Sequence, residues 1–306
     1  MQRIKVEAYA KLSDELENWL QSYKVMNVAP ITLMNYRHII MDLISLVGDL
    51  PVHELTEQVI TLYTERLMQR VSNFRTIASY LRSIRVFVNW LIKTGKVTPF
   101  KITLPRTERE PKEPYTEAEL KRLLIPPSKK HFCEYRNWVA INILIGTGCR
   151  RRSLLNLKIQ DVDLINQHII FRVTKSKKAL VVPVSDTLAC ILKQYIKARK
   201  AAQDDYLICN AFGDKMKENG FTHEIEKYNK NRGVQKTSVH LFRHTFAIMY
   251  LRANGNVVFL SRILGHRDIN TTMQYVNLVI SDLKRNFNQV SPLEQLSHHR
   301  SQLSLQ

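Results

Sequence analysis

The sequence lacks any long apolar run. No stretch approaches the ~20 consecutive apolar residues that a membrane-spanning helix needs, and Met1 to Lys5 do not begin a secretory signal. These absences argue against a membrane protein and against a secreted one. We therefore expect a cytoplasmic protein with no membrane partner.

Cysteine is also scarce, with four residues in 306. Cys133, Cys149, Cys190 and Cys209 lie far apart, and they form neither a CxxC pair nor a Cys/His set at zinc-ligand spacing. Their scatter argues against a zinc site. It indicates reduced, mostly buried thiols in a cytoplasmic protein.

Acidic residues are the minority charge. Lys and Arg number 46 against 27 Asp and Glu, which gives a formal net charge of +19. A two-metal nuclease needs clustered carboxylates, but the obvious pair, Asp161 and Asp163, resembles the turn after a helix. We expect no metal and no other cofactor. The excess positive charge predicts an extended polyanionic partner, with nucleic acid preferred.

Helical patterns fill residues 11–98, in a chain long enough for two domains. The clearest helix runs from about Asn73 to Thr94, with an apolar stripe at helical spacing and basic residues largely off that stripe. The stripe comprises Phe74, Ile77, Leu81, Ile84, Val88 and Leu91, and the basic set comprises Arg75, Arg82, Arg85 and Lys93. Arg75, Arg82 and Arg85 are candidate DNA contacts, and a merely solvated basic face is the alternative.

The helical periodicity lapses in residues 99–114, where four prolines stand among charged residues. We interpret this stretch as a linker. It separates an N-terminal domain, residues 1–98, from a second domain, residues 115–288, which a tail of residues 289–306 follows. A linker of roughly 16 residues spans about 50 Å when extended, enough for two domains to close around a DNA duplex.

The second domain combines helices with a small sheet. A capping box, Thr116 to Glu119, begins a helix, and an apolar helix from Trp138 ends at Gly146-Thr147-Gly148, just before three consecutive arginines. Residues 167–184 change to a β-rich pattern of two strands joined by a basic turn. Further helices are expected over 186–200 and 215–230. The fold class is therefore mostly α with a small β-sheet.

The stretch from His240 to Tyr275 holds the most chemistry. His240 and Arg243 stand three apart on a predicted helix, so both can approach one phosphate. Gly265 ends a second helix and places His266 just beyond its end. Residues 270–272 offer an N-cap for a third helix with Tyr275 in its first turn. Each residue alone is more often structural, and only their order and spacing favour a site.

The motifs HxxRHT, LGH and TTxxY, with the tyrosine nine residues after the LGH histidine, resemble those of the tyrosine recombinase (phage integrase) family. The resemblance covers most of residues 115–285 and is Xer-like in its two-domain organisation. It implies an N-terminal helical core-binding (SAM-like) domain and a C-terminal α+β catalytic domain. It also implies that His240, Arg243, His266 and Tyr275 are catalytic.

Two more family motifs follow from this resemblance. The arginine run resembles the box TGxRxxEL, which makes Arg150 the first catalytic arginine and Arg151 a DNA contact; Ser153 stands at the usual Glu, which in the family supports that arginine. Aligning Val182-Pro183 with the family's VP makes Lys175 the catalytic lysine. Lys177 and Lys178 are then DNA contacts, and a shifted register is the alternative.

The implied chemistry suits these residue types. Arg150 and Arg243 would bind the non-bridging phosphate oxygens in bidentate fashion, while Tyr275 attacks phosphorus. His240 would accept the phenolic proton, His266 would orient the phosphate, and Lys175 would protonate the leaving 5′ oxygen. A 3′-phosphotyrosyl intermediate conserves the bond energy, so neither ATP nor metal is required.

The resemblance implies a site-specific recombinase of double-stranded DNA that exchanges strands through a Holliday junction. It implies a homotetramer on DNA, a monomer or weak oligomer off DNA, accessory DNA-bending proteins as further partners, and a tail that docks on a neighbouring subunit. We expect a nucleoid-associated enzyme that integrates, excises or resolves a mobile element. The alternatives are Xer-type chromosome dimer resolution, a type IB topoisomerase, and an inactive integrase-fold DNA-binding protein.

Overall fold

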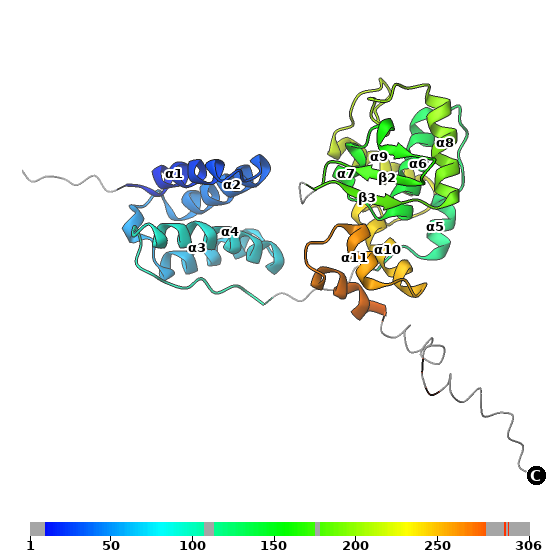
Figure 1. Ribbon diagram of the computed structural model, residues 1–306. Coiled ribbons are helices and arrows are strands. Elements are labelled where there is room, and N and C mark those ends of the chain that lie inside the picture. The colour runs from blue at the N-terminus through cyan, green and yellow to red at the C-terminus, as the bar shows by residue number, and fades with distance from the viewer. Residues whose placement is uncertain (1–9, 107–112, 175–177, 280–290, 292, 294–306) are drawn as a thin grey trace, which may run out of the picture. The chain divides into compact units, whose positions relative to one another are not determined.

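The computed structural model describes residues 10–106, 113–174, 178–279, 291 and 293. The chain divides into two compact units, Met1–Glu110 and Pro111–Gln306 (Figure 1). The division falls within the stretch that the sequence predicts as a linker. In the described ranges, no helix combines the length and apolarity that crossing a membrane requires.

The N-terminal unit is a bundle of helices around Trp19. The Trp19 side chain is fully buried, and its ring lies 5.0 Å from that of Phe87. The elements are α1 (Leu12–Val25), α2 (Pro30–Val47), the 3-10 helix η1 (Val52–Glu54), α3 (Glu57–Arg70) and α4 (Phe74–Lys93). These confirm the helices expected over residues 11–98.

Helix α4 begins after Asn73, whose side chain accepts a hydrogen bond from the amide of Arg75. The predicted apolar stripe is buried from Ile77 onward. Phe74, which the sequence places in that stripe, is instead 53% exposed. As the first residue of the helix, it lies one turn before the packed segment.

The C-terminal unit contains an antiparallel sheet in the order β1-β2-β3. Ile169 pairs with Val182 and Phe171 with Leu180, and the side chains of Ile169, Phe171 and Val182 are buried. The strands are β1 (Val162–Asp163), β2 (His168–Phe171) and β3 (Leu180–Pro183). The predicted hairpin is β2 and β3, and β1 is an edge strand that the sequence did not predict.

The carboxylates of Asp161 and Asp163 have structural partners near this sheet. Asp161 is buried and accepts a hydrogen bond from Arg172 Nε at 2.6 Å. Asp163 accepts from the amides of Ile165 and Asn166 at 3.0 and 2.9 Å, as a turn residue does. Both carboxylates therefore support the sheet and its turn.

Several helices of this unit pack against α6 (Figure 1). Helix α6 is buried on nearly all sides, which explains why its sequence is apolar without a clear stripe. The helices are α5 (Glu117–Leu123), α6 (Phe132–Thr147), α7 (Arg151–Leu155), η2 (Ile159–Asp161), α8 (Asp186–Arg199), α9 (Glu218–Asn231), α10 (Val239–Arg252) and α11 (Val257–Leu264). Residues 270–279 are also helical. The expected helices over 186–200 and 215–230 correspond to α8 and α9.

Of the cysteines, Cys149 and Cys209 are buried and Cys133 and Cys190 are exposed.

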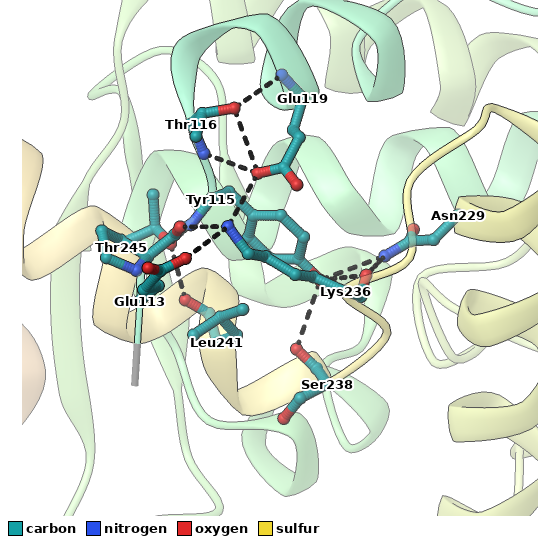
Figure 2. A network of polar contacts seen from close by, with 10 residues as sticks. Glu113, Tyr115, Thr116, Glu119, Asn229, Lys236, Ser238, Leu241 and Thr245 are labelled. Atoms are coloured by element: carbon teal, nitrogen blue, oxygen red, sulfur yellow. Dashed lines mark hydrogen bonds and ion pairs between the residues drawn. The ribbon is translucent and has the colours of Figure 1, made fainter. Parts of the chain in front are cut away.

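Tyr115 fixes the beginning of this unit to α10 (Figure 2). Its amide donates to Thr245 Oγ1 at 2.9 Å, its hydroxyl donates to the Lys236 carbonyl at 3.0 Å, and its ring stacks on Phe242 at 4.5 Å. The Lys236 ammonium in turn donates to Glu119 at 3.2 Å. These contacts hold the segment before α10 and the first turns of α10 against the core, next to Arg243.

Candidate active site

Arg243 is a buried cation held by neutral partners. Helix α10 packs against α6, which leaves the Arg243 side chain only 3% exposed. Its Nη1 donates to the Gly148 carbonyl at 2.9 Å, and its Nη2 donates to the Leu264 carbonyl at 2.8 Å and to His266 Nε2 at 2.7 Å. Because carbonyl and imidazole groups carry no net charge, the positive charge stays available to an anion.

Arg150 lies beside Arg243 at the same backbone carbonyl. Its Nη1 donates to Leu264 O at 3.3 Å, so both guanidinium groups share one acceptor. Burial lowers the pKa of Arg150, and burial together with the charge of Arg150 lowers the pKa of Arg243. Both groups stay protonated at neutral pH, because the pKa of a guanidinium is ordinarily far above neutrality and the lowered pKa of Arg243 is still about 10. Two adjacent cations thus form an anion-binding position.

Gly148 makes the close approach of Arg150 to Arg243 possible. It ends α6 with a positive φ of 62°, and an added Cβ would lie 2.4 Å from Phe246 Cδ1 and 2.9 Å from Leu264 Cδ2. A side chain would therefore clash in addition to straining the backbone. The tight turn places Arg150 at the N-cap of α7 and directs the Gly148 carbonyl to Arg243.

His266 follows the left-handed Gly265, as the sequence predicted. Its Nδ1 lies 2.7 Å from Thr272 Oγ1, while Nε2 faces Arg243. Burial and the charges of Arg243 and Arg150 lower the pKa of His266 to about 4. The imidazole is therefore neutral at physiological pH.

Tyr275 is half-buried beside the two arginines. Burial raises the pKa of its phenol, and the charges of Arg243 and Arg150 oppose that rise. Its ring centroid lies 5.2 Å from that of His244. Asp268 Oδ1 accepts from the Asn270 amide at 2.9 Å, so the helix begins earlier than the sequence predicted, and Tyr275 lies in its second turn.

A hollow of about 560 Å³ opens beside Arg150 and His266. Its wall also includes Lys178 and Arg267, and the described lining residues include no carboxylate. One side is formed by the end of the β2–β3 connection and the other by the segment after α11. Positive groups on several sides make the hollow suitable for a phosphate.

The structure thus brings together Arg150, Arg243, His266 and Tyr275 of the predicted catalytic residues. His240 lies in the first turn of α10 and is exposed, three residues before the buried Arg243. Lys175 and Lys177 lie outside the described residues. The catalytic roles stay predictions.

The predicted DNA-contact residues differ in their surroundings. Lys178 lines the hollow, and Arg75, Arg82 and Arg85 are exposed on α4 in the N-terminal unit. Arg151 instead donates to Glu218 Oε2 at 2.6 Å and to Thr222 Oγ1 at 2.6 Å on α9. Its guanidinium has internal partners, and a contact with DNA stays a prediction.

Three contacts of the site were not predicted from the sequence. Ser153 is buried in α7, and support for Arg150 comes from the Leu264 carbonyl, which no side-chain motif can reveal. His244 was visible beside Arg243 in the HxxRHT motif, but its packing against Tyr275 was not predicted. Thr272 was considered only as a helix cap, whereas its hydroxyl contacts His266.

A pair of arginines, a neutral histidine and a tyrosine that lie together can bind a phosphodiester and attack it. The chain belongs to the phage integrase family, whose sequence profile matches residues 115–280. It is a tyrosine recombinase, an enzyme class of site-specific DNA recombination.

Curated relatives and solved structures agree with this family. The chain is 29% identical to the tyrosine recombinase XerA of Saccharolobus solfataricus over 212 residues, which are 69% of this chain and 66% of that protein. It is 26% identical to the tyrosine recombinase XerA of Thermococcus kodakarensis over 288 residues, which are 92% of this chain and 96% of that protein.

Two solved structures share the fold. The Tn1549 transposon integrase in complex with transposon right end DNA has a TM-score of 0.75 at 23% identity, with 87% of this chain and 94% of that chain covered. A lambda integrase tetramer bound to a Holliday junction has a TM-score of 0.70 at 15% identity, with 87% and 80% covered. At these identities the likeness establishes the fold.

The titration of His266 gives a first prediction. In the free enzyme the ring of His266 should stay neutral until the pH falls to about 4, because burial and two neighbouring guanidinium groups disfavour the imidazolium. The unfolded chain takes up this proton nearer pH 6.5, so this group makes the fold less stable as the pH falls between those values.

NMR titration of the histidine ring signals measures this pKa, and His266→Asn assigns the resonance. Arg150→Ala should raise the midpoint, since one positive charge is removed. A midpoint near 6.5 in the wild type would show that the arginines do not act on His266.

Proposed function

We propose that this recombinase cleaves DNA by attack of the Tyr275 oxygen on a phosphodiester held by Arg150 and Arg243. The observation that carries the proposal is the convergence of both guanidinium groups on the Leu264 carbonyl, beside Tyr275 and His266. The Tyr275 Oη–phosphorus bond forms and the bond from phosphorus to the 5′ oxygen breaks. The product is a 3′-phosphotyrosyl enzyme and a free 5′ hydroxyl end.

The arginines stabilise the charge that develops on phosphorus. Pre-positioned donors are most effective where the transition state carries more charge than the substrate. Since the carbonyls of Gly148 and Leu264 already fix the Arg243 guanidinium, little reorganisation of that group is needed when a phosphate enters. His266, neutral at physiological pH, hydrogen-bonds to a non-bridging oxygen.

Two protons must move in each cleavage. Burial raises the pKa of Tyr275, so the phenol is protonated at neutral pH and needs a base. We assign that role to His240, which precedes Arg243 by one helical turn. Lys175 donates a proton to the leaving 5′ oxygen, which would otherwise depart as an unstable alkoxide.

A sulfur-substituted substrate tests the role of Lys175. Lys175→Ala should be severely slow on ordinary DNA, but close to wild type on DNA with a 5′-bridging sulfur at the cleavage site, because a thiolate departs without protonation. Single-turnover cleavage of both substrates measures the difference. Arg243→Ala should stay slow on both substrates, since it serves the phosphorus centre.

Lys178 is the matched control for this experiment, because it lines the hollow beside Arg150 and His266. Rescue by sulfur in Lys177→Ala or Lys178→Ala, and not in Lys175→Ala, would move the proton donor along the turn. Absence of rescue in all three variants would remove the general acid from this hairpin.

DNA binding by both units follows from the charge and its distribution. The net charge is +19, and on α4 the side chains of Arg75, Arg82 and Arg85 are exposed, off the buried stripe that begins at Ile77. We propose that residues 1–98 form the core-binding domain, that 115–288 form the catalytic domain, and that the 99–114 linker lets the two close around a duplex. Association with the nucleoid follows from DNA binding.

Strand exchange requires four active sites at a junction, and we propose a homotetramer on DNA. The similar lambda integrase is a tetramer on a Holliday junction in its solved structure, which supports this assembly. In this arrangement the 289–306 tail docks on a neighbouring subunit, and accessory DNA-bending proteins can assist.

We propose that the biological task of this recombinase is the integration, excision or resolution of a mobile element. The similar Tn1549 integrase comes from a transposon, whereas the XerA relatives favour Xer-type chromosome dimer resolution as the alternative. Footprinting on the DNA that flanks its own gene separates the two. A protected inverted repeat beside the gene supports the mobile element, and its absence favours a chromosomal site.

Covalent trapping on a nicked suicide substrate tests the chemistry itself. The nick lets a short 5′ fragment diffuse away, so cleavage should accumulate protein linked to the 3′ phosphate. Formation of no adduct on a footprinted site would indicate an inactive DNA-binding protein. Relaxation of supercoiled DNA without a defined site would indicate a type IB topoisomerase.

A further inference from the structure

Both ring nitrogens of His266 have an assigned hydrogen-bond partner. Arg243 Nη2 lies 2.7 Å from Nε2, and Thr272 Oγ1 lies 2.7 Å from Nδ1. A guanidinium has donors and no acceptor, so Nε2 must accept. In a neutral imidazole the single proton then lies on Nδ1, and that N–H donates to the Thr272 hydroxyl.

Thr272 is placed for this contact by the helix that carries the nucleophile. Its side chain is fully buried, within the helix of residues 270–279. Thr272 and Tyr275 are three residues apart, so they share one helical face. The hydrogen bond therefore joins the tyrosine helix to His266, and through His266 to Arg243.

A hydroxyl has a property that other common histidine partners lack. It can accept a hydrogen bond from Nδ1–H, and after rotation it can donate one to a bare Nδ1. A carboxylate or a backbone carbonyl only accepts, and so would keep the proton on Nδ1. Threonine thus allows both tautomers of His266 without leaving Nδ1 unpaired.

The two tautomers correspond to two states of the site. In the free enzyme Nε2 accepts from Arg243. A non-bridging phosphate oxygen bound beside Arg243 offers only lone pairs, so Nε2 must donate to it. The imidazole then loses its Nδ1 proton and gains one on Nε2, by exchange with water in the hollow that His266 lines. The net charge does not change, and the Thr272 hydroxyl turns to donate to Nδ1.

We infer that Thr272 is a positioning residue for strand cleavage, whose hydroxyl accepts from the Nδ1–H tautomer of His266 in the free enzyme and donates to the Nε2–H tautomer when phosphate is bound. The inference rests on the proposed function, because it takes the bound anion to be the scissile phosphate. It assigns the second threonine of the TTxxY motif to the site.

Three substitutions separate the hydroxyl from the bulk of the side chain. Thr272→Val keeps the shape and removes the hydroxyl. Single-turnover cleavage on the suicide substrate should slow by about 10- to 100-fold, the range seen when a hydrogen-bond partner of a metal-ligating histidine is removed. Thr272→Ser keeps the hydroxyl and should cleave at close to the wild-type rate. Thr271→Val is the control, because Thr271 is exposed in the same helix.

A double-mutant cycle tests whether Thr272 acts through His266. In a His266→Ala background, Thr272→Val should have little further effect on the cleavage rate, since the shared partner is already absent. Full additivity of the two effects would overturn the inference, because Thr272 would then act elsewhere. Equal slowing by Ser and Val, or wild-type rates in Thr272→Val, would overturn it as well.

The tautomer itself is measurable without DNA and without cleavage. Two-bond nitrogen–proton NMR on histidine-labelled enzyme should identify the Nδ1–H tautomer of His266 in the free protein, and an Nε2–H tautomer there would overturn the inference even if Thr272→Val failed to fold. Failure of the proposed function has a different result, because the wild type would then form no covalent adduct. An active wild type with an unaffected Thr272→Val would reject only the role of Thr272.

Discussion

Tyr275→Phe is expected to abolish covalent attachment of the enzyme to DNA at every incubation time. Phenylalanine keeps the ring that packs 5.2 Å from His244, so the helix of residues 270–279 should stay in place. What disappears is the oxygen that forms the bond to phosphorus. DNA binding should persist because the arginines, which supply most of the charge in the site, are unchanged.

Denaturing electrophoresis of the suicide-substrate reaction measures the adduct, and a gel-shift assay measures binding. Tyr250→Phe is the matched control, since Tyr250 lies on α10 of the same unit and packs against Phe246 at 5.9 Å. Its adduct yield should equal that of the wild type. An equal yield from Tyr275→Phe would assign the nucleophile to another residue.

Arg243→Ala and Arg150→Ala should each slow cleavage by at least about 10²-fold at saturating DNA, the scale for loss of one pre-positioned donor. Binding should weaken much less, because each arginine acts mainly on charge that develops in the transition state. Single-turnover rates and equilibrium binding measured on the same DNA separate the two effects.

Arg243→Lys distinguishes charge from geometry. Lysine keeps the positive charge, but an ammonium is a point charge and cannot reproduce the planar fork that joins Gly148 O, Leu264 O and His266. We expect the Arg243→Lys variant to be nearly as slow as the alanine variant.

Arg151 tests the alignment of the arginine run with the family's TGxRxxEL box. Normal cleavage by Arg150→Ala together with slow cleavage by Arg151→Ala would shift the catalytic arginine by one residue.

Much of the fold could be predicted because its signals are local. The stripe of α4, the stop at Gly148 and the β2–β3 hairpin each depend on periodicity or turn chemistry within a few residues. The exceptions have physical causes. Phe74 precedes the packed part of α4, and the edge strand β1 is two residues long, too short to have an alternating pattern.

The sequence by itself determined which side chains could perform the chemistry. Arg243, His266 and Tyr275 lie within 36 residues that begin at His240, and their order and spacing indicated one site. The resemblance to the tyrosine recombinase family added Arg150 to that site. Net charge indicated the polyanionic partner. These properties follow from residue type and local order, which need no knowledge of distant contacts.

Only the tertiary structure decided how those side chains are held. The carbonyls of Gly148 and Leu264 are the acceptors for Arg243, and they belong to segments 95 and 21 residues away. Arg151 turns to Glu218, 67 residues away on α9. A backbone carbonyl is the same in every residue, so its role appears only when packing brings it to a cation. For the same reason, the ring nitrogen of His266 that carries the proton could be inferred only from the structure, in which Arg243 lies at Nε2 and Thr272 at Nδ1.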